Sequence, residues 1–193
     1  YPDDYARYVT DKAAYDTFIN HALDNYDLEF TTSGSANWIS QTETTHDGED
    51  AMQSGAITHN QGTSIQTIID GPGKIGFWWK VNSQLPYDKL DFTLNHTKVI
   101  SSISGDIDWT YYEYVLGFGQ HLLTWRYWKD GSINGGLDKA WLDQVTYTAG
   151  NEGFNTTIAE ISPNPSNNDG KITLDWNDVV GATKYYLYRH TSS

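Results

Sequence analysis

The sequence predicts an all-β fold, a two-sheet jelly-roll sandwich that follows a short N-terminal helix or arm. From Leu28 onward, apolar and polar residues alternate with a period of two, which is typical of half-buried strands. Between Leu28 and Thr148, Gly-, Asn- and Asp-rich turns divide this region into about eight to ten strands, enough for two layers. The 193 residues include 8 Trp, 14 Tyr and 6 Phe but no Cys, so aromatic side chains supply the core without disulfides.

Residues 11–24 carry the clearest helical pattern. Their apolar side chains share one expected helix face at spacings of three and four: Ala14, Phe18, Ile19, Ala22 and Leu23. Residues 1–10 show no clear period, so they form either an extended arm or a frayed start to the helix. We therefore predict an arm and a short helix over residues 1–22.

The strand predictions rest on alternating apolar positions. Two strands present the following residues on one face each: Ile75, Phe77, Trp79 and Val81, then Leu90, Phe92 and Leu94. Residues 109–116 and 121–129 are expected to form a hairpin with aromatic cross-strand pairs, joined by a turn at residues 117–119. Residues 140–147 form the last expected strand, and the jelly roll is assigned to residues 23–149.

Charge and hydropathy narrow the classes of function. The chain has 12 Lys and Arg against 25 Asp and Glu, a net charge of −13, which opposes nucleic-acid binding and favours a divalent cation as partner. No stretch approaches the ~18 consecutive apolar residues of a membrane span. The acidic, Lys-poor composition is typical of an extracellular prokaryotic β-protein. The first residue is Tyr1, so we expect a mature, excised or incomplete chain.

Several sequence blocks, in the same order, resemble a jelly-roll module of large secreted or surface proteins of bacteria and archaea, distantly like the MAM and cleaved-adhesin sandwiches. The blocks are residues 22–24 (ALD), 28–42, 46–55 (HDGEDAMQSG), 71–81 (GPGKIGFWWKV), 105–109, 123–132 (LTWRYWKDGS) and 141–147 (WLDQVTY). The resemblance covers about two-thirds of the chain. Where such modules commonly carry an Asp-Gly turn, this chain has Asn95-His96-Thr97.

The C-terminal residues predict a separate segment. Residues 150–160 read as a linker, and residues 161–193 resemble the start of a fibronectin type III domain, an immunoglobulin-like sandwich. The resemblance rests on a Pro-rich entry, a strand with Trp176, Gly181-Ala182-Thr183 and a strand at residues 184–189. A complete sandwich of this kind needs roughly 90 to 100 residues. We therefore expect a partial sandwich, completed either within a longer chain or by a neighbouring chain.

Asp143 is the main candidate ligand of a metal ion. It appears in phase with Trp141, Val145 and Tyr147 on the apolar side of its strand, and a carboxylate buried there must be paired, hydrogen-bonded or bound to a metal. The resemblance implies a structural Ca²⁺ ion held partly by an Asp at this place. The expected co-ligands are three acidic residues of the 46–55 block: Asp47, Glu49 and Asp50. The alternative is that backbone groups or Arg126 satisfy Asp143.

Two further kinds of binding or modification site follow from the sequence. Asn95 and Asn155 lie in N-glycosylation triplets, so both are candidate glycan acceptors in a secreted chain. Trp109 and Trp128 are candidates for stacking against carbohydrate, although most of the strand aromatics are expected to pack in the core.

The sequence offers little support for an enzyme. It has no Cys, and it lacks the Gly-x-Ser-x-Gly, His-Glu-x-x-His and Gly-rich phosphate-loop motifs. Paired carboxylates for glycoside hydrolysis stay open, because such a pair assembles only in the fold. We therefore expect a non-enzymatic extracellular structural or adhesive module, either a fibre subunit that pairs strands with other copies of itself or a unit beside neighbouring domains. The alternative is a carbohydrate-binding module of a larger secreted enzyme.

Overall fold

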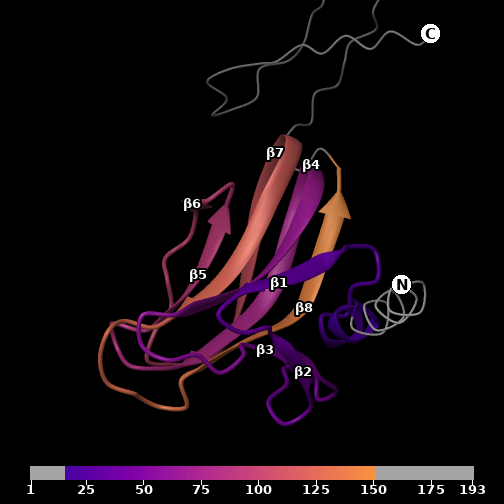
Figure 1. Cartoon of the computed structure of the whole chain (residues 1–193). Helices are drawn as coiled ribbons and strands as arrows, with labels where there is room; N and C mark the ends of the chain where they lie inside the picture. The colour runs from indigo at the N-terminus through magenta and orange to yellow at the C-terminus, as the bar shows by residue number, and fades with distance from the viewer. Residues whose placement is uncertain (1–15, 151–193) are drawn as a thin grey trace, which may run out of the picture. The chain divides into compact units, whose positions relative to one another are not determined.

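The computed structural model describes residues 16–150, which contain one short helix at residues 16–22 and an antiparallel β-sandwich (Figure 1). The strands are β1 (Phe30–Gly34), β2 (Ile39–Gln41), β3 (Ala51–Gln53), β4 (Gly62–Asn82), β5 (Lys89–Leu94), β6 (Thr97–Lys98), β7 (Asp106–Trp128) and β8 (Lys139–Ala149). No helix in this part of the chain is long and apolar enough to cross a bilayer. The expected arm at residues 1–10 and the fibronectin-like segment at residues 161–193 lie outside the described residues.

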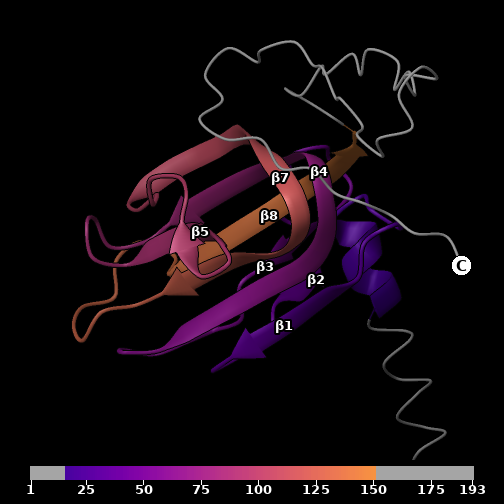
Figure 2. The same cartoon turned by 90° about the horizontal axis from the view of Figure 1, so that it is seen from above.

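The long strands β4 and β7 pair with each other along almost their whole length and belong to both layers. Their register runs from Gly62 opposite Trp128 to Asn82 opposite Asp106. The first half of β4 and the second half of β7 form one layer with β1, β5 and β6. The remaining halves form the other layer with β8, β3 and β2. In Figure 2 the two strands curve side by side from one layer into the other.

The predicted hairpin at residues 109–129 is wrong, because both halves belong to the single strand β7. The Gly-Phe-Gly sequence at residues 117–119 is where the β4–β7 ribbon passes between layers, and its register shifts between Gly71 and Gly73. Gly71 packs so closely there that a Cβ atom would overlap the Gly117 carbonyl oxygen. The aromatic pairs expected within a hairpin are instead made with β4, as Phe77 opposite Tyr112.

Aromatic rings from the two layers meet in the core. Phe77 of β4 lies with its ring centroid 4.9 Å from Phe92 of β5 and 5.2 Å from Trp125 of β7. The predicted inward face of β4 is confirmed: Ile75, Phe77, Trp79 and Val81 are all fully buried. Large rings that contact across the layers pack the core of this Cys-free domain.

The helix docks with a different face from the predicted one. Ile19, Ala22 and Leu23 are buried, but Phe18 is 62% exposed. Adjacent helical residues point about 100° apart, so the face that buries Ile19 turns Phe18 outward. After the helix, the Leu23 carbonyl accepts a hydrogen bond from the Val145 N–H at 2.9 Å, and this contact fixes the helix end to β8.

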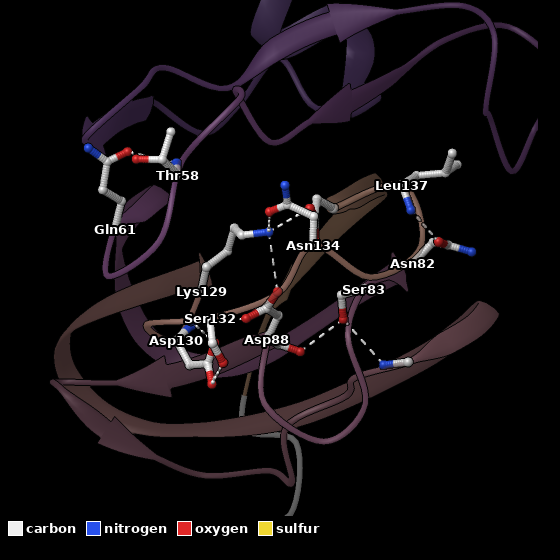
Figure 3. A network of polar contacts seen from close by, with 12 residues as sticks. Thr58, Gln61, Asn82, Ser83, Asp88, Lys129, Asp130, Ser132, Asn134 and Leu137 are labelled. Carbon is white, nitrogen blue, oxygen red and sulfur yellow. Dashed lines mark hydrogen bonds and ion pairs between the residues drawn. The ribbon is translucent and has the colours of Figure 1, made fainter.

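A buried ion-pair network closes the end of the sandwich where β7 stops (Figure 3). The Lys129 Nζ lies 3.3 Å from Asp88 Oδ2, 2.5 Å from Asp138 Oδ2 and 3.0 Å from Asn134 Oδ1. Asp88 also accepts a hydrogen bond from the Asp130 N–H at 2.9 Å. Because the Lys129 and Asp88 side chains are both inaccessible to solvent, removing either charge would cost about 3–5 kcal/mol.

The crossing of the ribbon gives a test of the fold. Gly71→Ala should lower the free energy of unfolding by about 2–4 kcal/mol, because its Cβ atom has no room against the Gly117 backbone. Gly117→Ala is the matched control, since a Cβ there meets no atom within 4 Å, and it should have a near-wild-type value. Urea unfolding of both variants measures the difference. Equal losses would contradict the close approach.

Candidate functional site

A β-bulge decides where the Asp143 side chain lies. Trp78 faces Asp143 and Gly76 faces Thr146, so two residues of β8, Gln144 and Val145, lie opposite one residue of β4. Gln144 has a positive φ of 48°, which marks the extra residue. The bulge reverses the side-chain alternation. Asp143 therefore shares the outer face of the layer, not the core face of Val145, and the expectation that these two residues are in phase is wrong.

Asp143 is buried because two other segments cover it on this outer face. Asp24 follows the helix, and Asp47 lies in the β2–β3 loop. One carboxylate oxygen from each of Asp24, Asp47 and Asp143 lies within 4.8 Å of the other two. Oxygens that share a Ca²⁺ ion at 2.3–2.6 Å can be at most about 5 Å apart, so this spacing suits a common calcium ion.

One oxygen of Asp143 is satisfied and the other is not. Oδ2 accepts a hydrogen bond from the His46 N–H at 2.7 Å, but Oδ1 is buried and has no hydrogen-bond partner. The alternative that backbone groups satisfy Asp143 therefore holds for Oδ2 alone. A buried carboxylate oxygen without a donor carries a desolvation cost, which protonation or a bound cation relieves. The residues present thus fit a bound divalent cation.

The pKa values of the cluster reflect crowded negative charge. The pKa of Asp143 is raised to about 6, mainly by burial and also by the nearby carboxylates of Asp47 and Asp24, while backbone hydrogen bonds from His46 and Gln144 oppose the shift. Burial and the charges of Asp47, Asp50 and Glu49 also raise the pKa of Asp24. Ionising the whole cluster is therefore costly without a compensating positive charge.

The structure brings together part of the expected ligand set. Asp47 and Asp143 join, whereas Glu49 and Asp50 are outside the group. Asp50 pairs with the His21 Nδ1 at 2.6 Å, and the Glu49 N–H donates to Asp47 Oδ1 at 2.8 Å. Asp24 is the ligand candidate that the sequence reasoning missed. Its acidity and its place directly after the helix were visible, but its approach to β8 depends on how the helix docks.

His46 joins the acidic cluster to a row of aromatic rings on the same outer face. Its ring stacks on Trp78 with centroids 3.7 Å apart and meets Trp109 edge-on at 5.9 Å. Tyr111 of β7 has its ring centroid 5.4 Å from that of Trp78 of β4. Of the two Trp residues expected to stack against carbohydrate, the structure therefore places Trp109 in an aromatic row.

Trp128 lies elsewhere and makes polar contacts. Its Nε1 donates to Asp91 Oδ2 at 2.8 Å, and the Lys89 ammonium sits 5.7 Å from its ring centroid. The indole is therefore held by these two residues in the other layer, apart from the row that contains Trp109.

Of the two predicted glycan acceptors, Asn95 lies within the described residues. Asn95 is exposed at the tip of the β5–β6 hairpin, where it and His96 both have positive φ. Its Oδ1 accepts a hydrogen bond from the Leu122 N–H at 2.9 Å. Asn155 lies outside the described residues, so both acceptors stay predictions.

No protein-family model matches the chain, and neither does any curated protein sequence. Among solved structures, the chain is similar to the secreted serine protease VesC from Vibrio cholerae, with 12% identity and a TM-score of 0.51. The match covers 70% of this chain and 27% of VesC, so the chain spans only about a quarter of that protein's length. At this identity the similarity supports the fold alone.

Two other matches have lower TM-scores. A cleaved adhesin domain of Lys-gingipain from Porphyromonas gingivalis has 15% identity and a TM-score of 0.49, covering 63% of this chain and 91% of that one. The CBM22-1 xylan-binding domain of a Paenibacillus barcinonensis protein has 17% identity and a TM-score of 0.44, covering 61% and 83%.

Burial of Asp143 predicts a pH dependence for the metal-free protein. Its pKa is raised from 3.8 to about 6 on folding, so its contribution to stability is greatest below pH 4 and is lost as the pH rises through 6. The full loss is about 3 kcal/mol. Urea unfolding in chelator from pH 4 to 7.5 should show this loss relative to Asp143→Asn, which does not titrate. Parallel curves for the two proteins would contradict it.

Proposed function

We propose that this chain is a non-catalytic extracellular β-sandwich module with a structural or adhesive role, and that Asp24, Asp47 and Asp143 hold a structural calcium ion. The observation that carries the proposal is the buried Asp143 Oδ1, which has no hydrogen-bond donor and lies beside two more carboxylates. A cation would remove both the unsatisfied oxygen and the repulsion. Calcium is the preferred ion because all three groups supply hard carboxylate oxygens.

A bound ion would act as a cross-link between distant parts of the chain. Asp24 comes from the helix end, Asp47 from the β2–β3 loop and Asp143 from β8. The β2–β3 loop has few other anchors on β8, notably the His46 N–H on Asp143 Oδ2 and the His46 Nδ1 on Gln144 Oε1 at 2.6 Å. An ion held by all three aspartates would therefore have a structural role, because it would join the helix end, this loop and β8.

The fibre form of the proposal uses a free edge of the sandwich. Residues 106–116 of β7 pair with β4 and with no other strand of the described part. A strand edge of this length is a template for strand addition. In the fibre form, residues 1–10 of one copy pair with such an edge of the next copy, a contact that does not close and therefore propagates.

The second candidate function, a carbohydrate-binding module of a larger secreted enzyme, is favoured by the aromatic row at Trp109, Trp78 and Tyr111. It predicts a monomer with measurable sugar affinity, whereas the fibre form predicts polymers. Negative-stain microscopy of the native material separates the two.

Calcium should raise the thermal stability of chelator-treated protein. With calcium in large excess over its dissociation constant, the melting temperature should rise by roughly 5–10 °C, measured by circular dichroism or calorimetry. Asp143→Asn should abolish this rise, because it removes the buried ligand charge. It should also make the chelated protein more stable than the chelated wild type at pH 7. An unchanged wild-type melting temperature would refute the calcium proposal.

Glu49→Gln is the matched control for the ligand set, since Glu49 lies in the same loop but outside the cluster. It should keep the full calcium-dependent rise. Loss of the rise in this variant would show that the ion sits farther along the loop than the three aspartates place it.

Deleting residues 1–10 tests the fibre form. The shortened chain should stay a soluble monomer in negative-stain microscopy and size-exclusion chromatography under conditions where the full chain forms fibres, because the donor strand is gone. Its calcium-dependent melting should be unchanged, which shows that the module still folds. Fibres that persist after the deletion would rule out strand donation by this arm.

A further inference from the structure

The hydroxyl end of Tyr111 lies against β4 on the outer face of the sheet. A Cβ atom on Gly76 of β4 would collide with the Tyr111 Oη and would lie 3.1 Å from Cζ, so the phenol end of the ring rests on the β4 backbone. Tyr111 is nevertheless 44% exposed. The hydroxyl end of the ring therefore covers Gly76, and much of the side chain stays open to solvent. A Gly at position 76 is what makes this placement possible.

The groups around this ring are polar, and their charges are paired. Lys74 Nζ lies 3.3 Å from Glu113 Oε1, and Glu113 Oε2 lies 3.4 Å from the Tyr111 Oη. Farther along the same two strands, the Lys80 Nζ of β4 lies 2.6 Å from the Asp108 Oδ1 of β7. Around Tyr111 the surface thus offers hydrogen-bond donors and acceptors in oppositely charged pairs. Such a surface matches a neutral ligand that carries many hydroxyl groups.

The aromatic row continues from Tyr111 toward the β2–β3 loop, which carries Asp47. Trp78 contacts Tyr111 on one side and the His46 ring on the other, and His46 in turn meets Trp109. His46 is positioned by its backbone hydrogen bond to Asp143. The arrangement of the aromatic row is therefore linked to the arrangement of the β2–β3 loop.

We propose that this face, with Tyr111 over Gly76 at its centre, binds a neutral polysaccharide by stacking a pyranose ring on Tyr111. The apolar C–H face of a pyranose would pack against the Tyr111 ring. Its hydroxyl groups would then hydrogen-bond to the charged side chains of Lys74 and Glu113 beside the ring. The net charge of −13 disfavours an anionic chain. The assignment rests on the second candidate function, a carbohydrate-binding module, and names the residue and the class of ligand for it.

Affinity electrophoresis of the full chain tests the site. Native gels that contain soluble xylan, galactan or mixed-linkage β-glucan, run with calcium present, should retard the wild-type protein in at least one case. Tyr111→Ala should weaken that binding at least tenfold, and Tyr111→Phe, which keeps the ring, should lose only a few-fold. Tyr87→Ala is the matched control, because Tyr87 is 53% exposed in the loop between β4 and β5 and should bind as the wild type does.

A second variant tests the geometry. Gly76→Ala keeps Tyr111 but displaces its ring, so it should also lose affinity at least tenfold, with folding checked by the calcium-dependent melting temperature. Absence of wild-type retardation in all three gels, or unchanged binding by Tyr111→Ala, would overturn the inference. So would a concentration-dependent dimer lost in Tyr111→Ala, because the occupant would then be a second copy. Any of these results with an intact calcium response leaves the calcium proposal standing.

Discussion

The pairing of β4 with β7 is the constraint on which the rest of the domain depends. Because the two strands remain paired as they pass from one layer to the other, they fix the crossing of the sandwich at Gly71 and Gly117. The same pairing places Phe77 toward the core and Trp78 toward the outer face. The core and the outer aromatic row are therefore two sides of one ribbon, and the packing that stabilises the fold also orients the surface.

The bulge at Gln144 creates the candidate metal site within that frame. A regular β8 would have pointed Asp143 and Val145 to the same face, where a carboxylate would have met the aromatic core. The extra residue turns Asp143 to the outer face, and the loop that carries Asp47 covers it. Bulges that redirect a side chain are common beside functional sites. Here the redirected side chain also holds His46, so the acidic cluster and the aromatic row share one loop.

Two buried aspartates in the domain, Asp88 and Asp143, differ in the sign of the charges that lie beside them. Asp88 is fully buried, but the Lys129 ammonium lies 3.3 Å from its Oδ2, so a positive charge already offsets its negative charge. Asp143 is equally buried, yet the charges that shift its pKa upward are those of Asp47 and Asp24, both of the same sign. The first site stabilises the end of the sandwich as it stands. The second gathers carboxylates that could hold a metal ion, and this asymmetry in charge distinguishes the two sites.

The sequence by itself determined the β class, the inward face of β4 and the presence of a short helix, because these follow from local alternation and spacing. It also singled out Asp47 and Asp143. Only the tertiary structure decided that residues 109–128 lie in one strand, because a Gly-x-Gly sequence fits a turn and a layer crossing equally well. The docked face of the helix, the phase of Asp143 and the arrival of Asp24 were likewise decided in three dimensions. A bulge and a docking angle depend on partners distant in sequence, and no local pattern encodes them.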